Sequence, residues 1–184
     1  MIRFLGMAVD TCRSNHHYSL SLHHLNHTAM PTEIERKFLV KNDGWRASAD
    51  AETAIKQGYL STSKERNVRV RQKGEKAFLT VKGKTEGISR LEFEYEIPLS
   101  DALEMLVLCD KPLIEKTRFL VAGPDGNTWE LDVFEGDNQG LIVAEIELES
   151  EDTTFALPDW AGEEVSHDQR YFNANLNKAP YSTW

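Results

Sequence analysis

Charged and apolar residues alternate with a period of two in many segments of this chain, and the pattern is strongest over 90–97. Successive side chains of a β-strand point to opposite faces, so this period predicts strands with one charged and one apolar face. Turn residues separate several of these segments, as in Gly123-Pro-Asp-Gly126. Together they predict about eight antiparallel strands, over the segments 31–40, 55–60, 68–71, 78–82, 90–97, 116–118, 129–133 and 144–149.

Two arrangements satisfy this alternation. The apolar faces can form the core of an ordinary sandwich or barrel, or the sheet can close with its charges inward and its apolar faces covered by helices. Alternation is the same from either side, so the period does not separate the two. The composition of the charged faces does favour closure, because they consist almost wholly of Glu, Asp, Arg and Lys, sorted by sign along the chain.

Closure would bring the first strand beside the last, so that Glu33 and Glu35 meet Glu145 and Glu147. Clustered carboxylates repel one another unless a multivalent cation lies among them. We therefore expect a mainly β (α+β) fold: an eight-stranded antiparallel closed β-barrel with a charged lumen and a few peripheral helices.

The candidate inward charges are ten acids and seven bases. The acids are Glu33, Glu35, Glu92, Glu94, Glu96, Glu130, Asp132, Glu145, Glu147 and Glu149. The bases are Lys37, Arg69, Arg71, Lys82, Arg90, Lys116 and Arg118. Hard divalent cations prefer carboxylate oxygens, and lysine and arginine bind phosphate. A divalent ion that bridges carboxylates to a polyphosphate would satisfy both sets.

Six motifs follow one another in order: the Glu-x-Glu-x-Lys of residues 33–37, the paired arginines of 69–71, the Thr-x-Lys of 80–82, the acidic strand 90–96, the Lys-x-Arg of 116–118, and the Ala-Glu-Ile-Glu of 144–147. In this order they resemble the CYTH superfamily, also called triphosphate tunnel metalloenzymes, over residues 30–181. The resemblance implies an eight-stranded tunnel that binds triphosphates together with two Mg²⁺ or Mn²⁺ ions.

The resemblance also implies roles for single residues. The metal ligands would be Glu33, Glu35, Asp132, Glu145 and Glu147. The substrate-binding cations would be Lys37, Arg69, Arg71, Lys82, Arg90, Lys116, Arg118 and Lys178. The catalytic residues would be Lys37 and Glu147.

The expected reaction is metal-dependent hydrolysis of inorganic triphosphate to pyrophosphate and phosphate, possible on this scaffold because metal ions and cations stabilise charge on a transferring phosphoryl group. The same scaffold also supports a class IV adenylate cyclase, which makes cyclic AMP and pyrophosphate from ATP, or a thiamine triphosphatase. A binding protein without catalysis, such as a polyphosphate or nucleotide sensor, is a further alternative.

The net charge of -9 and the pI near 5.2 argue against nucleic acid or an acidic membrane as the main partner. The partner that the resemblance implies is a small triphosphate compound. No apolar run approaches the ~20 residues of a membrane span. Two cysteines, Cys12 and Cys109, are few enough to predict a reduced, cytoplasmic protein. The sequence is compatible with a monomer or a homodimer.

Residues 1–29 differ from the rest, because they hold five of the six histidines and no clear periodicity. We expect a disordered or upstream extension there and a CYTH-like triphosphate tunnel domain over 30–184. An amphipathic helix is predicted over 100–108 with Ser100 as its N-cap. Short helices are predicted near 153–156 and over 173–178.

Overall fold

A computed structural model describes residues 32–184 except 64, 85 and 87. The strands are β1 Thr32–Val40, β2 Ala49–Thr62, β3 Arg66–Lys73, β4 Lys76–Gly83, β5 Ser89–Ile97, β6 Ile114–Ala122, β7 Thr128–Phe134, β8 Ile142–Glu147 and β9 Ala161–Glu164. The helices are α1 Leu99–Leu108 and α2 Asn173–Leu176, with 3₁₀ turns η1 Asp43–Ser48, η2 Gly136–Asn138, η3 Gln169–Tyr171 and η4 Tyr181–Thr183. The expectation for residues 1–29 lies outside the described residues.

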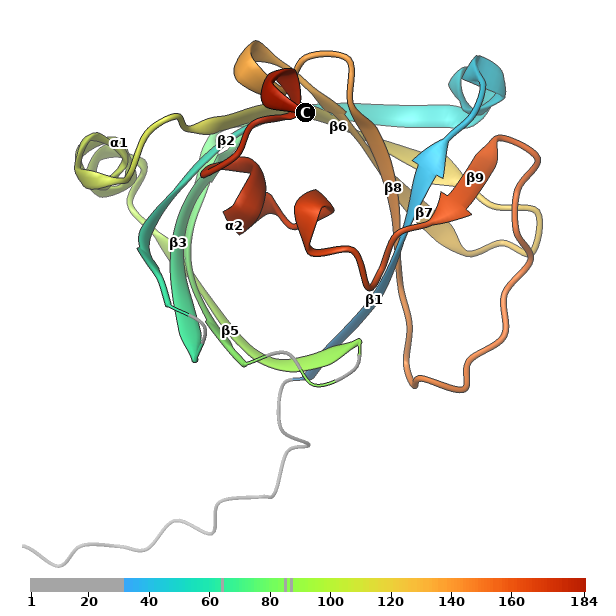
Figure 1. The fold of residues 1–184 in the computed structure, drawn as a ribbon, viewed down its shortest axis with the longest axis horizontal. Helices are drawn as coiled ribbons and strands as arrows, with labels where there is room; N and C mark the ends of the chain where they lie inside the picture. Colours follow the sequence, from blue (N-terminus) through green and yellow to red (C-terminus); the bar gives the residue numbers. More distant parts are fainter. Residues whose placement is uncertain (1–31, 64, 85, 87) are drawn as a thin grey trace, which may run out of the picture.

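Eight of these strands close into a barrel, as Figure 1 shows. The strand order is β5-β4-β3-β2-β6-β7-β8-β1, every neighbouring pair is antiparallel, and β1 also pairs with β5 through Glu33 opposite Arg90. The expected closed eight-stranded antiparallel barrel is therefore confirmed. The short β9 extends the sheet on the same edge of β1 that β5 uses, with Phe38 opposite Glu164.

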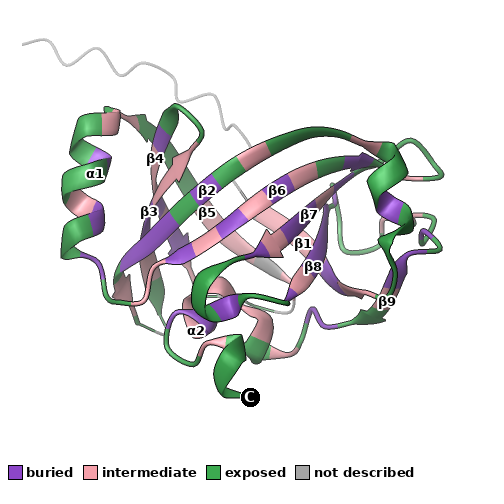
Figure 2. Ribbon diagram, turned by 90° about the horizontal axis from the view of Figure 1, so that it is seen from above, coloured by how far each residue is buried: buried purple, intermediate pink, exposed green. Residues whose placement is uncertain are grey.

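The outward faces of the strands carry two apolar layers. One includes Phe38 and Trp129 and is covered by η1 and the segment that leads to β9. The other lies under α1, which packs on β2, β3 and β4 through Ala102 and Leu106. Figure 2 shows buried and less buried residues alternating along β6, as a two-sided strand requires, whereas residues 57–59 of β2 are all buried.

Helix α1 confirms the predicted amphipathic helix, but its cap differs from the expectation. Pro98 precedes the helix, no side chain caps its first turn, and Ser100 lies inside it. Residues 153–156 form no helix. Phe155 packs instead against the apolar layer around Trp129, and the Ala156 N–H donates to Asp125 at 2.6 Å. The predicted helix over 173–178 is observed over Asn173–Leu176.

The C-terminal segment closes one end of the barrel. In the view of Figure 1, η3 and α2 lie within the outline of the ring of strands, and Figure 2 shows α2 at one end of the barrel. Leu176 is fully buried in an apolar cluster whose other members come mainly from the strands and the loop after β7: Leu39, Ile114, Phe134, Leu141, Val143 and Tyr171. Outside this cluster, the buried Asn177 amide donates to the carbonyls of Asp110 and Pro112, and the Tyr181 N–H donates to Asn138 Oδ1 at 2.9 Å. In the described part of the chain, no helix has the length and apolar character that a bilayer crossing requires.

Candidate active site

A cavity of about 720 Å³ lies within the barrel and is lined by side chains from all eight barrel strands and from the C-terminal segment. Charged residues dominate its wall. The basic ones are Lys37, Arg69, Arg71, Lys73, Lys82, Lys84, Arg90, Arg118 and Lys178. The acidic ones are Glu33, Glu35, Glu92, Glu94, Glu130, Glu145 and Glu147. A polar enclosed space of this kind suits a small, highly charged ligand rather than an apolar one.

Strand β1 brings Glu33, Glu35 and Lys37 to the cavity because residues two apart share one face of a strand. Lys37 is buried, and its Nζ lies 2.6 Å from Glu145 Oε1 on β8 and 2.9 Å from Glu35 Oε1. Burial alone would lower the pKa of Lys37, but the carboxylates of Glu145 and Glu35 outweigh it and hold that pKa above its ordinary value. Lys37 is therefore a fixed cation in this structure, which argues against a role as general base.

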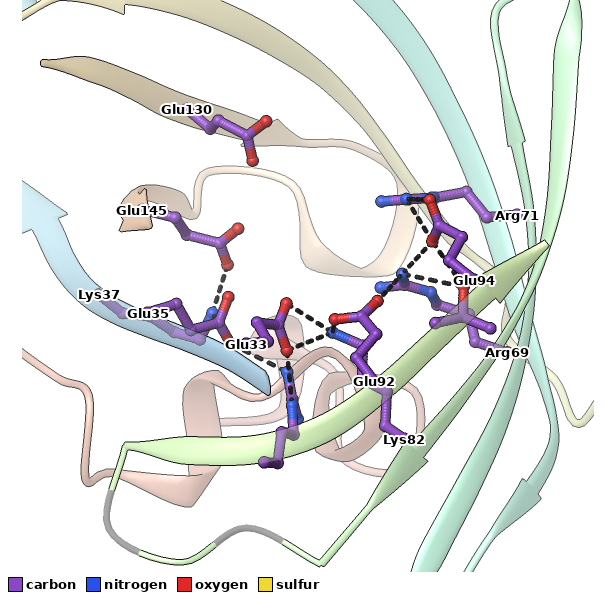
Figure 3. Close-up of polar contacts among 12 residues, drawn as sticks. Glu33, Glu35, Lys37, Arg69, Arg71, Lys82, Glu92, Glu94, Glu130 and Glu145 are labelled. Atoms are coloured by element: carbon purple, nitrogen blue, oxygen red, sulfur yellow. Dashed lines mark hydrogen bonds and ion pairs between the residues drawn. The ribbon is translucent and has the colours of Figure 1, made fainter. Parts of the chain in front are cut away.

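Glu33 stands at the seam where β1 meets β5. Its carboxylate accepts from Lys82 Nζ at 2.7 Å and from Arg90 Nε at 2.7 Å, as Figure 3 shows. Arg90 also reaches Glu35 at 3.0 Å, and Lys82 reaches Glu92 at 2.9 Å. Burial raises the pKa of Glu33, yet the charges of Lys82 and Arg90 outweigh it and leave the pKa well below its usual range. The Glu33 carboxylate is thus ionised and already neutralised by cations.

The paired arginines of β3, Arg69 and Arg71, form a second charged cluster in the cavity wall together with Glu94 of β5. Glu94 accepts from Arg71 at 2.8 Å and from Arg69 at 3.3 Å, and Thr80 donates to the same carboxylate at 2.7 Å. The Nε atoms of Arg69 and Arg71 are buried and have no hydrogen-bond partner among the described residues. A buried donor without a partner is costly, so these two N–H groups are suited to an acceptor-rich ligand such as a phosphate chain.

Arg118 links the two carboxylate strands β7 and β8. Its guanidinium donates to Asp132 at 2.7 and 2.6 Å, to Glu145 at 2.8 Å, and to Glu130. Asp132 is fully buried, is absent from the cavity wall, and also accepts from the buried Lys116. Burial, reinforced by the charge of Arg118, lowers the pKa of Lys116 to about 8 in spite of that contact with Asp132.

Asp132 and Lys116 are the expected metal and phosphate ligands that do not line the cavity. Both belong to the inward face, but they lie below the cavity wall, where they pair with each other. The Asp132 carboxylate already accepts from two cations, so a metal ion could reach it only by displacing one of them. A period of two predicts which residues face inward, but it contains no information about their depth along the barrel.

Glu147 is the exposed carboxylate at the end of β8 that has no hydrogen bond or ion pair with any described residue. Burial and the negative charges of Glu33, Glu130 and Glu35 raise its pKa above the usual range. The described residues contain no group of three Asp, Glu, His or Cys side chains spaced as a metal site. The cavity carboxylates Glu33, Glu35, Glu145 and Glu147 nevertheless fit a hard divalent ion, because such ions prefer carboxylate oxygens and the negative charge around Glu147 is not balanced.

Among the other sequence-predicted residues, Lys178 does line the cavity, and its Nζ lies 3.4 Å from the Thr62 carbonyl. Glu96 and Glu149 do not line it. The neutral wall residues Asn67, Ser166, Gln169 and Asn173 were missed, since a search for alternating charge gives no signal for them.

Comparisons with known proteins agree with the motifs. A family model described as the CYTH domain matches residues 31–181. A protein of Acetivibrio thermocellus named inorganic triphosphatase is 49% identical over 156 residues, which covers 84% of this chain and 99% of that protein. One of Nitrosomonas europaea with the same name is 40% identical over 150 residues, covering 79% and 96%.

A solved structure of an inorganic triphosphatase has 37% identity, a TM-score of 0.58, and coverage of 79% of this chain and 93% of that one. Dependence on a metal is typical of the tunnel enzymes with this domain. The family model spans nearly all of the described residues, and the two relatives exceed one third identity over most of their length. The chain therefore belongs to the CYTH domain family.

Proposed function

We propose that the protein is a divalent-metal-dependent hydrolase that splits inorganic triphosphate into pyrophosphate and phosphate. The observation that carries this proposal is the cavity itself: basic side chains line the space inside a closed ring of strands, and two arginine Nε–H groups there are buried without a partner among the described residues. Relatives that match this chain over most of their length bear the name inorganic triphosphatase, which supports the same substrate. A chain of phosphates without an organic group suits this wall, where Tyr59 and Phe172 are the aromatic members.

The basic residues of the wall would bind the phosphates from several strands and from the C-terminal segment. Arg69 and Arg71 would offer their unpaired Nε atoms, and Lys37, Lys82, Arg90, Arg118 and Lys178 would neutralise the remaining oxygens. Preorganised cations of this kind stabilise the charge that develops when the phosphoanhydride bond breaks. Lys116 is left out of this set because it lies below the wall.

The carboxylates Glu33, Glu35, Glu145 and Glu147 would hold the metal, for which we propose two ions of Mg²⁺ or Mn²⁺. Bound there, the metal would polarise a phosphoryl oxygen and lower the pKa of a water molecule. Lys82 and Arg90 pair with Glu33 in the structure, and Lys37 pairs with Glu145. When these cations turn to phosphate, the carboxylates lose their partners and become available to the metal, so we expect metal and substrate to bind cooperatively.

The test is a substrate panel with each metal. Release of phosphate and pyrophosphate would be measured from inorganic triphosphate, ATP and thiamine triphosphate, together with formation of cyclic AMP from ATP. We expect inorganic triphosphate to give the highest kcat/KM. Faster cyclic AMP formation would replace the hydrolase by a cyclase, and faster turnover of thiamine triphosphate would change the substrate.

Glu147→Gln separates an enzyme from a binding protein, and Glu149→Gln, two residues beyond the end of β8, is the matched control. Glu147 lines the cavity and Glu149 does not. We expect Glu147→Gln to lose most of the turnover and Glu149→Gln to keep it. Background turnover in the parent protein, combined with tight binding of triphosphate, would favour a sensor.

A further inference from the structure

One edge of β1 changes its partner strand around the buried residue Lys37. On this edge β5 pairs with residues 32–34, and β9 pairs with Phe38 and Val40. Between the two, Lys37 turns both of its backbone groups toward the segment just after β9. The Val165 N–H donates to the Lys37 carbonyl at 2.8 Å. The Lys37 N–H meets no backbone carbonyl and donates to the side chain of Ser166, Oγ, at 2.9 Å.

The Ser166 hydroxyl thus accepts the hydrogen bond that a backbone carbonyl of a neighbouring strand would otherwise accept. A second hydrogen bond fixes the orientation of this hydroxyl. Ser166 Oγ donates to Glu164 Oε1 at 2.7 Å, and the Glu164 carboxylate also accepts two hydrogen bonds from Arg36, at 2.9 and 2.7 Å. The hydroxyl therefore accepts on one side and donates on the other, which fixes its rotation. Its residue is buried and belongs to the wall of the cavity.

This chain of contacts ends on two consecutive residues of β1 that point to opposite sides. Arg36 lies on the outer side, over the ring of Phe155 at 5.4 Å, and Lys37 points inward to Glu145 and Glu35. Burial raises the pKa of Glu164, but the hydrogen bonds from Arg36 and Ser166 outweigh it and keep the carboxylate ionised. The outer ion pair and the inner lysine are therefore connected through one hydroxyl group.

We infer that Ser166 is a positioning residue, which holds the backbone of Lys37 and so sets where its side chain enters the cavity between β1 and β8, with Glu164 fixing the serine. Its effect on turnover rests on the proposed function, whereas its effect on the Lys37 backbone does not. A misplacement of about 1 Å in a catalytic group costs up to roughly 100-fold in rate. Removal of the hydroxyl should therefore act mainly on kcat, because the Lys37 ammonium would keep its charge near the phosphates and lose the exact position in which it stabilises the charge that develops in the transition state.

The sharpest comparison is Ser166→Val against Ser166→Thr, since the two replacements have nearly the same shape and only threonine keeps the hydroxyl. We expect Ser166→Val to lower kcat for triphosphate by about 10- to 100-fold with little change in KM, and Ser166→Thr to restore most of it. Hydrogen exchange of the Lys37 amide, followed without substrate, should accelerate in Ser166→Val and stay slow in Ser166→Thr.

Glu164→Gln provides the second arm if Ser166→Val fails to fold, with Glu163→Gln on the same strand as its control. Glu164→Gln should shift kcat and the Lys37 amide in the same direction by a smaller factor, while Glu163→Gln leaves both unchanged. Equal kcat in the valine and threonine variants, a change confined to KM, or an unaltered Lys37 amide would overturn the inference. Absence of triphosphate turnover in the parent protein would remove the proposed function, and the amide exchange would still decide the role of Ser166.

Discussion

Truncation of Leu176 measures how firmly the C-terminal segment closes the barrel. Leu176 has 0% exposure and packs among side chains of β1, β6, β7 and β8. Leu176→Ala removes three carbon groups, which at about 0.8 kcal/mol each sets a minimum loss of about 2.4 kcal/mol. The cavity left behind adds to this loss where the surroundings fail to collapse. Asn177 and Tyr181 tie the segment to two loops, so collapse is restricted.

We therefore expect Leu176→Ala to lower the free energy of unfolding by about 3–5 kcal/mol, which for a domain of this size lowers Tm by roughly 6–20 °C. Denaturant unfolding followed by circular dichroism measures the first quantity, and a thermal melt measures the second. Leu157→Ala is the control, because Leu157 is 51% exposed and its truncation should change stability by less than about 0.5 kcal/mol. A loss below 1 kcal/mol in Leu176→Ala, by order of magnitude, would mean that the segment does not pack inside the barrel.

Two further substitutions test the packing under α1 and the arginine pair. In Gly58→Ala the new Cβ would lie 2.6 Å from Cys109 Cβ and 2.7 Å from Leu113 Cδ2, so we expect a loss of about 1–3 kcal/mol in denaturant unfolding; an unchanged midpoint would contradict this packing. The charges of Arg71 and Arg69 and the hydrogen bond from Thr80 outweigh burial and lower the pKa of Glu94, so its stabilisation is present above the ordinary carboxyl pKa and is lost as pH falls through the folded pKa. The difference in unfolding free energy between the parent and Glu94→Gln should therefore be full near neutral pH and shrink below about pH 4.3, and a constant difference across that range would refute the assignment.

The barrel is well predicted from the sequence because the alternation within each strand shows which residues share a face. The alternation over 90–97 placed Arg90, Glu92 and Glu94 in the cavity wall, and the sorting of signs anticipated the closure that brings β1 beside β8. Spacing along one strand contains no information about the partner strand, so the pairing of Lys82 with Glu33 appears only when the ring closes. Ser166 gave no signal, because its role comes from a neutral hydroxyl in a loop.

Asp132 shows most clearly what spacing leaves undetermined. It shares a face of β7 with Glu130, yet the Glu130 side chain is 36% exposed and that of Asp132 is 0% exposed. The two residues therefore stand at different depths in the barrel. At the greater depth the carboxylate meets Lys116 and Arg118, and it is the counter-charge that allows both cations to be buried.

If Asp132 neutralises buried cations and does not bind metal, Asp132→Asn and Glu147→Gln should differ both in stability and in their response to metal. Breaking a buried ion pair leaves an uncompensated charge, so we expect Asp132→Asn to lose about 3–5 kcal/mol of stability while the rise of Tm on adding Mg²⁺ or Mn²⁺ persists.

For Glu147→Gln we expect the opposite: stability is kept and the response to metal is lost. Its carboxylate has no cationic partner among the described residues and is repelled by Glu33, Glu130 and Glu35, so its neutralisation should not destabilise the protein, while the metal-dependent rise of Tm should disappear. Thermal melts of the two variants with and without metal provide the measurement. If Asp132→Asn lost the metal response as Glu147→Gln does, Asp132 would have to exchange its cations for the metal, and the barrel floor would be part of the metal site.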